Sequence, residues 1–329
     1  MYLEKKKING EVYNYLKLSI RQGNKVRTKT VVYLGKDNLS KEHLKSLIAK
    51  YKTKEQKIKE ETLKEFMSEE HKIIESFLSE SEISKLEQIK SIFRKKINNL
   101  DKQTKQDMFN DFLVVYAYNT NAIEGNTLTL RETDLLLNKG ITPEGKTLRE
   151  INDHLNAKKV FDLILNNELE INHENIIRLH SLLMENIDQR VGAYRSFNVR
   201  VIGARFESTP AEFVKADMGI LLKWFEKNQN KMHPLVTASI FHHKFEKIHP
   251  FCDGNGRTGR ALLNLILLKN NLPPLVISDA QRKKYYEALS SADNADLTKI
   301  QPEHEKIVKF CYLSLLKTYL HEKKSGIYT

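Results

Sequence analysis

A glycine-rich loop that runs directly into an apolar helix constrains the fold of this 329-residue chain more than any other stretch. The loop begins at His249, contains Gly254-Asn255-Gly256, and passes into the apolar run Ala261 to Leu268. Its glycines let successive backbone N–H groups turn toward one point, and the start of a helix adds unpaired N–H groups and the positive end of its dipole. The sequence therefore predicts a seat for an anion at the start of a buried helix.

Four side chains around this seat supply the chemistry that phosphate handling requires. Arg257 and Arg260 lie three residues apart, so they project from one side of the helix and bring two positive charges toward the same oxyanion. Asp253 is a hard carboxylate at which Mg²⁺ could bridge phosphate oxygens. His249 is a base that titrates near neutrality. This combination favours a polyphosphate as the anion.

These residues match a known signature. They reproduce without a gap the pattern H-x-F-x-D/E-G-N-G-R-x-x-R, with His249, Phe251, Asp253, Gly254, Asn255, Gly256, Arg257 and Arg260. The chain thus resembles the Fic (Fido) family of protein-modifying enzymes. The plainer interpretation, an ordinary loop before a core helix, accounts for the glycines but not for the carboxylate and the two arginines.

The resemblance implies a mainly α-helical catalytic domain with a β-hairpin flap, and transfer of AMP from ATP to a Ser, Thr or Tyr hydroxyl of a protein. His249 would be the catalytic base, and Asp253 would hold Mg²⁺ on the α- and β-phosphates. The remaining signature residues would bind the nucleotide, namely Gly254, Asn255, Gly256, Arg257 and Arg260. Fic relatives that transfer UMP, phosphate or phosphocholine are alternatives. So is a nucleotide-sensing or nucleic-acid-binding regulator with a vestigial Fic site.

A second motif ends the helix predicted over Asp107 to Ala122. Thr120 and Glu124 lie four residues apart, hence on one face, and a carboxylate at a helix C-terminus is electrostatically unfavourable unless it meets a cation. An exposed C-terminal carboxylate is the plain alternative. The stretch resembles the inhibitory motif S/T-x-x-x-E-G/N of one Fic class, whose glutamate pairs with the second signature arginine, here Arg260. The resemblance implies that Glu124, seated by Thr120, restrains transfer by occupying the place of the γ-phosphate, and that the protein can also remove AMP.

Two further parts of the site are expected from the resemblance. The stretch Gln281 to Leu289 is similar to the helix that borders the adenine pocket, so Tyr286 would stack on or bond to the base. Asp293 stands where relatives often carry asparagine, which leaves the base preference open. Residues 199–206 alternate and are broken by Gly203, which predicts a hairpin flap that would hold a target polypeptide near His249 by main-chain pairing. A hairpin packed on the helices would have the same pattern.

The remainder of the chain is divided by composition. Residues 1–37 predict a small β-meander, because three Tyr-, Val-, Ile- and Thr-rich runs are separated by turn residues. Residues 38–103 predict a charged helical connector and lead-in with long helices, since Ser40 to Leu100 contains no glycine or proline. This connector would allow a homodimer, although its apolar spacing is too irregular to predict a coiled coil. The catalytic domain would occupy residues 104–300, followed by a C-terminal helix and tail over 301–329.

The net charge of +12 permits contact with nucleic acid or acidic proteins but establishes neither. In the meander, Tyr13, Tyr15 and Tyr33 alternate with basic residues, a pattern compatible with nucleic-acid binding but more typical of a solvated sheet face. The only cysteines are Cys252 and Cys311, too few for a disulfide framework. Because no stretch predicts a signal peptide or a membrane span, we expect a cytoplasmic protein.

Overall fold

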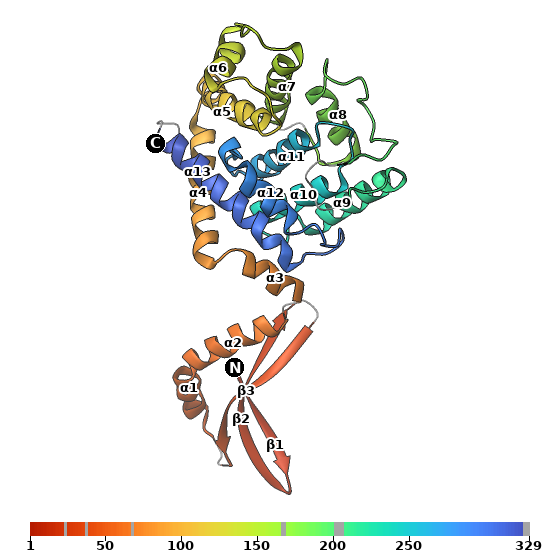
Figure 1. The fold of residues 1–329 in the computed structure, drawn as a ribbon. Coiled ribbons are helices and arrows are strands. Elements are labelled where there is room, and N and C mark those ends of the chain that lie inside the picture. Colours follow the sequence, from red (N-terminus) through yellow and green to blue (C-terminus); the bar gives the residue numbers. More distant parts are fainter. Residues whose placement is uncertain (23–24, 37–38, 67–68, 166–168, 201–206, 325–329) are drawn as a thin grey trace. The chain divides into compact units, whose positions relative to one another are not determined.

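A computed structural model describes residues 1–22, 25–36, 39–66, 69–165, 169–200 and 207–324. The predicted mainly helical fold with a small antiparallel sheet is confirmed (Figure 1). Contacts divide the chain into two compact units, Met1–Lys72 and Ile73–Thr329.

The N-terminal unit is a three-stranded sheet covered on one face by two helices. Its strands β1 (Tyr2–Ile8), β2 (Glu11–Gln22) and β3 (Lys25–Gly35) pair antiparallel in the order β1-β2-β3. Helices α1 (Lys41–Lys50) and α2 (Lys52–Phe66) follow. The buried strand residues Leu16, Leu18, Ile20 and Val31 pack against Leu44, Ile48, Tyr51 and Ile58 of the helical segment.

This packing explains why the structural division falls near residue 72 and not near residue 37, where composition changes. The sheet needs an apolar partner, and α1 and α2 supply it. The helical connector expected over residues 38–103 is divided into successive helices, although it contains no glycine or proline. Ser79 and Glu82 form a capping box at the start of the helix Glu80–Asn99, and Asp101 caps the start of the helix Lys102–Ala122.

The second unit is built from helices around a buried centre. Its helices are α3 (Glu69–Phe77), in which the division falls, α4 (Glu80–Asn99), α5 (Lys102–Ala122), α6 (Leu130–Lys139), α7 (Leu148–Leu165), α8 (His173–Leu183), α9 (Val214–Asn228), α10 (Pro234–Ile248), α11 (Asn255–Lys269), α12 (Arg282–Ser290) and α13 (Glu305–Lys324). Short 3-10 turns precede three of them, at Ala211–Phe213, Asp279–Gln281 and Pro302–His304.

Helix α11 is the centre of this unit. Every residue from Arg257 to Leu267 is buried, and α5, α7, α8 and α10 all contact the helix. Figure 1 shows α11 lying among these neighbours. The helix that follows the glycine-rich loop is therefore the core element that the sequence predicts, and its first turn is held from several sides.

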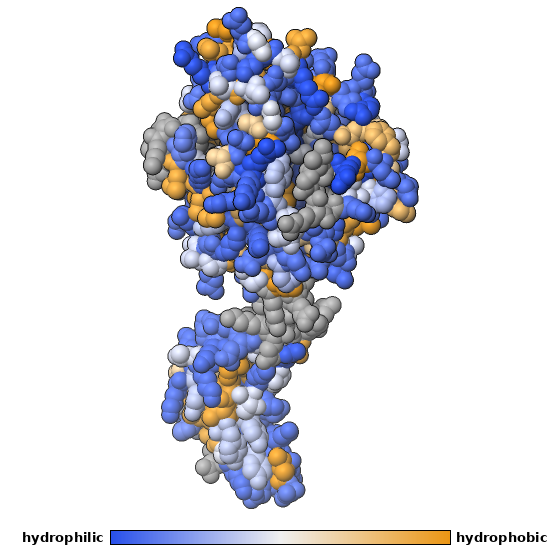
Figure 2. Space-filling view, viewed as in Figure 1, coloured by the Kyte–Doolittle hydropathy of each residue, from blue (hydrophilic) through white to orange (hydrophobic). Residues whose placement is uncertain are grey.

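The surface is largely hydrophilic on the face shown in Figure 2, where hydrophobic residues are scattered singly or in small groups. Among the described residues, no helix combines the length and the apolar content needed to cross a bilayer.

Candidate functional site

His249 follows the last turn of α10 in a left-handed backbone conformation, with φ 53°. Its Nδ1 lies 3.3 Å from the carbonyl oxygen of Glu246, so Nδ1 is the atom that carries hydrogen, which leaves Nε2 free to accept a proton. Burial lowers the pKa of His249 to about 4, so the imidazole is neutral at pH 7. The Nε2 atom of His249 is therefore unprotonated at pH 7, the state that a general base requires.

Arg195 holds the backbone around this histidine. Its Nε donates to the carbonyl oxygen of His249 at 2.8 Å, and its backbone N–H donates to that of Pro250 at 2.9 Å. The same guanidinium also bonds to the carbonyl oxygens of Phe197 and Thr209. One buried side chain thus ties His249 to the two ends of the segment between Phe197 and Thr209. Sequence analysis missed Arg195, because nothing in its local pattern indicates this clamp.

The glycine-rich loop is braced from inside. Phe251 is buried and stacks on His180 of α8, with ring centroids 3.6 Å apart. The Nε2 of His180 donates to the carbonyl oxygen of Asp253 at 3.0 Å. The Asn255 side chain accepts from the Phe251 N–H and donates to the Phe251 carbonyl, both at 2.8 Å. Both polar atoms of the Asn255 side chain therefore close the loop, and its role in nucleotide binding stays a prediction.

The first turn of α11 already holds an anion, the carboxylate of Glu124. Gly254 caps the helix with φ 76°, and a Cβ there would lie 2.6 Å from the sulfur of Met184. At Gly256 a Cβ would lie 2.4 Å from Glu124 Oε1 and 2.9 Å from an Arg260 nitrogen. Glycine at this position thus lets the carboxylate approach the turn whose backbone N–H groups have no intrahelical partner.

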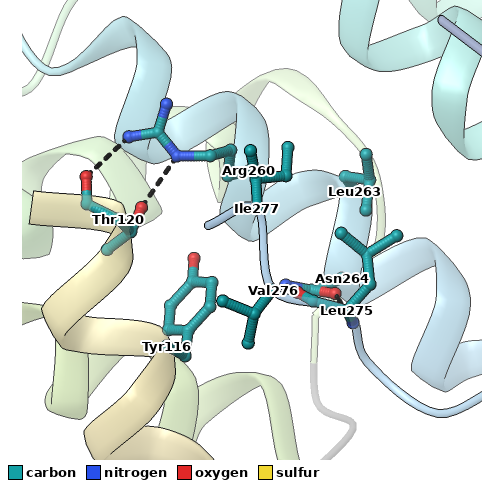
Figure 3. Close-up of a pocket in the computed structure, with 8 residues that line it drawn as sticks. All are labelled: Tyr116, Thr120, Arg260, Leu263, Asn264, Leu275, Val276 and Ile277. Carbon is teal, nitrogen blue, oxygen red and sulfur yellow. Dashed lines mark hydrogen bonds between the residues drawn. The ribbon is translucent and has the colours of Figure 1, made fainter. Parts of the chain in front are cut away.

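Arg260 joins this carboxylate to α5. Its Nη2 donates to Glu124 Oε1 at 2.8 Å and to the Thr120 carbonyl at 2.8 Å, and its Nε donates to Thr120 Oγ1 at 2.8 Å. Figure 3 shows Arg260 reaching the hydroxyl and the carbonyl of Thr120 beside the ring of Tyr116. Burial alone would lower the pKa of Arg260, but Glu124, Tyr285 and Glu246 together raise this pKa above its usual value.

Arg257 pairs with a different carboxylate from the one that Arg260 meets. It pairs with Asp153 of α7, and its Nη2 lies 3.5 Å from Asp253 Oδ1. Both arginines are buried, yet Arg257 is held on the α7 side and Arg260 on the α5 side. The two arginines thus meet different carboxylates, because helical spacing sets where the side chains leave the helix but not which partners they meet. Their binding of one oxyanion together stays a prediction. Asp153, which fixes Arg257, carries no signal in the sequence.

Asp253 lies at the edge of the site and is suited to Mg²⁺. Its Oδ1 accepts from the Gly254 N–H at 2.6 Å, and its Oδ2 pairs with Arg149 of α7. Burial would raise its pKa, but Arg257 and Arg149 lower it, so the carboxylate is ionised at pH 7. The described part of the chain holds no group of three His, Cys, Asp or Glu that could ligate a metal. A single carboxylate nevertheless fits Mg²⁺, which keeps several waters and takes substrate oxygens as its other ligands.

A cleft of about 1250 Å³ opens beside these residues. One wall is formed by Glu124 and by His249, Asp253, Gly256 and Arg260 of the glycine-rich loop and α11, and another wall includes Arg282, Tyr286, Glu287 and Asp293. Both Tyr285 and Tyr286 line the cleft, but Tyr286 is 42% exposed, whereas Tyr285 is buried and bonds to His242 at 2.7 Å. Of the two adjacent tyrosines, Tyr286 is therefore the one available to a ligand.

Glu246 lies at the floor of the cleft and differs from the other carboxylates. Burial raises its pKa to about 8, so it is mostly protonated at pH 7. Sequence analysis missed it. The predicted flap over 199–206 lies outside the described residues at positions 201–206, and only Val199 and Arg200 are described; Arg200 lines the cleft.

Sequence comparison matches the part of the chain that carries the glycine-rich loop to one protein family. Residues 170–267 match the Fic/DOC family profile. Protein adenylyltransferase fic-1 of Caenorhabditis elegans is 31% identical over 235 residues, which cover 68% of this chain and 46% of that protein. Protein adenylyltransferase Fic of Drosophila ananassae is 34% identical over 190 residues, which cover 55% and 37%. The chain thus spans less than half the length of these curated relatives.

Solved structures agree at the level of the fold. A Fic domain-containing signalling protein from Bacteroides thetaiotaomicron superposes with a TM-score of 0.65 at 24% identity, covering 71% of this chain and 95% of that chain. A fragment of Fic-1 from Caenorhabditis elegans superposes with a TM-score of 0.60 at 27% identity, covering 74% and 73%.

Proposed function

Because this chain belongs to the Fic/DOC family, we propose that it is a protein adenylyltransferase, which transfers AMP from ATP to a Ser, Thr or Tyr hydroxyl of a target protein. The main support is the seat at the start of α11, where the Glu124 carboxylate lies against Gly256 and Arg260. A site that accommodates an internal carboxylate there has the charge and the donors for a phosphate.

The target hydroxyl would lose its proton to Nε2 of His249 as its oxygen attacks the α-phosphorus. The new bond joins that oxygen to AMP, and the bond to pyrophosphate breaks. The neutral imidazole described above is the form that can accept the proton. Backbone N–H groups at the start of α11 would stabilise the negative charge on the α-phosphate, and Arg260 would hold the terminal phosphates. Mg²⁺ at Asp253 would neutralise charge on the α- and β-phosphates.

Glu124 would restrain this reaction by competing with the γ-phosphate for Arg260. A carboxylate and a phosphate are alternative acceptors for the same guanidinium donors. Thr120 favours the inhibited arrangement, because it supplies two of the three hydrogen bonds that hold Arg260 against α5. Removal of AMP would be a separate reaction of this site, in which a water positioned by Glu124 attacks the phosphorus, the bond to the target oxygen breaks, and AMP and the free hydroxyl are released.

Labelling with two forms of ATP tests the proposal. The Glu124→Gly variant, incubated with Mg²⁺ and ATP labelled at the α-phosphate, should label itself or proteins of a lysate, and Glu124→Gly combined with His249→Ala should not. Label from γ-labelled ATP would instead identify phosphoryl transfer, and label from α-labelled UTP alone would identify UMP transfer. Absence of label from every nucleotide would refute a transferase function and favour a nucleotide-sensing protein.

A second candidate role, nucleic-acid binding, concerns the N-terminal sheet. Tyr33 lies 5.3 Å from Tyr15 and 6.2 Å from Tyr13 between ring centroids, and it is 49% exposed. Such an aromatic cluster could stack on unpaired bases. The ion pairs of Lys17 with Glu4 and of Lys36 with Glu11 offset part of the positive charge on this sheet.

Fluorescence anisotropy with labelled single-stranded RNA and DNA tests this role in the full chain. Tyr33→Ala should weaken binding, while the control Tyr118→Ala in α5 should not. If the parent chain and Tyr33→Ala bind RNA and DNA with equal affinity, the tyrosines are an ordinary solvated sheet face and the nucleic-acid-binding role is refuted.

A further inference from the structure

Arg149 occupies the oxygen that a metal ion would need. It lies in the first turn of α7, and its Nη2 pairs with Asp253 Oδ2. The other oxygen, Oδ1, already accepts the Gly254 N–H and faces Arg257. Since the Gly254 bond belongs to the loop backbone, Oδ2 is the oxygen of Asp253 that is left for Mg²⁺. Ligation of Mg²⁺ and pairing with Arg149 therefore exclude each other at this atom.

The two arginines beside Asp253 differ in how easily they can leave. The Arg257 side chain is 4% exposed and is clamped by Asp153. The Arg149 side chain is 56% exposed, and the carboxylate that it meets is 38% exposed. An ion pair open to water is weak, whereas Mg²⁺ carries twice the charge and binds oxygen directly. Arg149 is thus the displaceable partner of Asp253, and Arg257 is the fixed one.

We propose that Arg149 takes the place of the metal in the nucleotide-free protein and becomes a phosphate-binding residue when the metal arrives. Resting on the proposed use of ATP, this inference assigns Arg149 two successive partners. The first is Asp253 Oδ2, which Arg149 holds in position at the edge of the seat. The second is the polyphosphate of the metal–nucleotide complex.

The second step follows from the chemistry of the released side chain. A metal on Asp253 Oδ2 brings the phosphate oxygens that share its coordination shell to the place where the guanidinium starts. Guanidinium is permanently charged and presents several N–H donors that match phosphate oxygens in pairs. Its long and exposed side chain can turn without disturbing the core. Arg149 would therefore oppose the metal alone but favour the metal together with nucleotide.

Removing any positive charge near Asp253 would also favour a cation and disfavour ATP, so a second arginine near Asp253 serves as the comparison. Mn²⁺ serves as the probe for the metal site, and its binding to the full-length chain without nucleotide is followed by electron paramagnetic resonance. Arg149→Ala should bind Mn²⁺ about fivefold tighter than the parent chain, the factor expected from removing one exposed ion pair. Arg149→Ala should also bind ATP more weakly than the parent chain in saturating Mn²⁺, as measured by calorimetry.

Arg190→Ala is the matched control. Arg190 is similarly exposed and lies close enough to Asp253 to interact with it electrostatically, but its hydrogen bonds go to Asp188. Its loss should change Mn²⁺ affinity less than twofold. Equal effects of the two substitutions on Mn²⁺, or unchanged ATP affinity in Arg149→Ala, would overturn the proposal. Both readouts are binding constants and do not depend on catalysis. The Arg149 proposal can therefore be refuted while AMP transfer is observed, and AMP transfer can be refuted while the predicted binding changes are observed.

Discussion

Replacing Glu124 with alanine should increase the affinity for ATP while leaving the affinity for ADP nearly unchanged. In the structure, the Glu124 carboxylate lies 2.8 Å from Arg260 Nη2 and against the first turn of α11. If the γ-phosphate competes for this guanidinium, ATP must break the Glu124–Arg260 pair before it binds fully. ADP lacks the competing group, so its affinity does not depend on the pair.

The magnitude follows from the environment of the two partners. Hydrogen bonds to charged groups contribute about 1.5–3 kcal/mol when they are protected from water. Arg260 is buried, but the Glu124 side chain is 36% exposed, so solvent screens part of the interaction. We therefore assign the pair about 1–2 kcal/mol. At about 1.4 kcal/mol per factor of ten, ATP should bind about 5–30 times more tightly to the Glu124→Ala variant.

Isothermal titration calorimetry with ATP and ADP, both in Mg²⁺, measures this difference. Glu287→Ala is the control, because Glu287 is an exposed carboxylate that lines the same cleft and does not pair with Arg260. Thermal unfolding of each variant establishes that the chains compared are equally folded. If Glu124→Ala changes ATP and ADP affinity by the same factor, or if Glu287→Ala has the same effect, competition with the γ-phosphate is refuted.

Three further outcomes test the catalytic loop. The transfer rate of the Glu124→Gly variant should stay nearly constant from pH 8 down to about 5.5. Burial lowers the pKa of His249 to about 4, so protonation would inactivate this base only near that pH. A decline centred near pH 6.5 would contradict a buried neutral base. Asn255→Ala should lower the free energy of unfolding by about 1–3 kcal/mol, measured in urea, because two backbone groups of Phe251 lose their partners; an unchanged midpoint would contradict the bracing role. Arg195→Lys should reduce kcat and leave the Kd for ATP unchanged, because the shorter reach of one ammonium cannot reproduce the planar fork that spans the carbonyls of His249 and Phe197. Equal loss in both constants would point to general damage.

Much of the helical architecture could be predicted because its signals are local. The apolar run after the loop predicts a buried helix, and α11 is buried from Arg257 to Leu267. The three strands of the meander were predicted from runs rich in Tyr, Val, Ile and Thr and from the turn residues between them, and they form the small antiparallel sheet expected. The division between units could not be predicted in the same way. A change in composition marks the end of the sheet, but it does not reveal that α1 and α2 supply the apolar partner of that sheet.

The amino-acid sequence by itself determined the groups that lie within one turn of each other: the glycines of the loop, the base before it and the arginines after it. Such features depend on backbone conformation and helical period, which act over a few residues. Only the tertiary structure decided which partner each charged group meets. Arg257 pairs with Asp153 and Arg149 with Asp253, each across 104 positions of sequence. The packing of α5 and α7 against α11 sets these encounters, and no local pattern encodes the distance between side chains on helices so far apart in the chain.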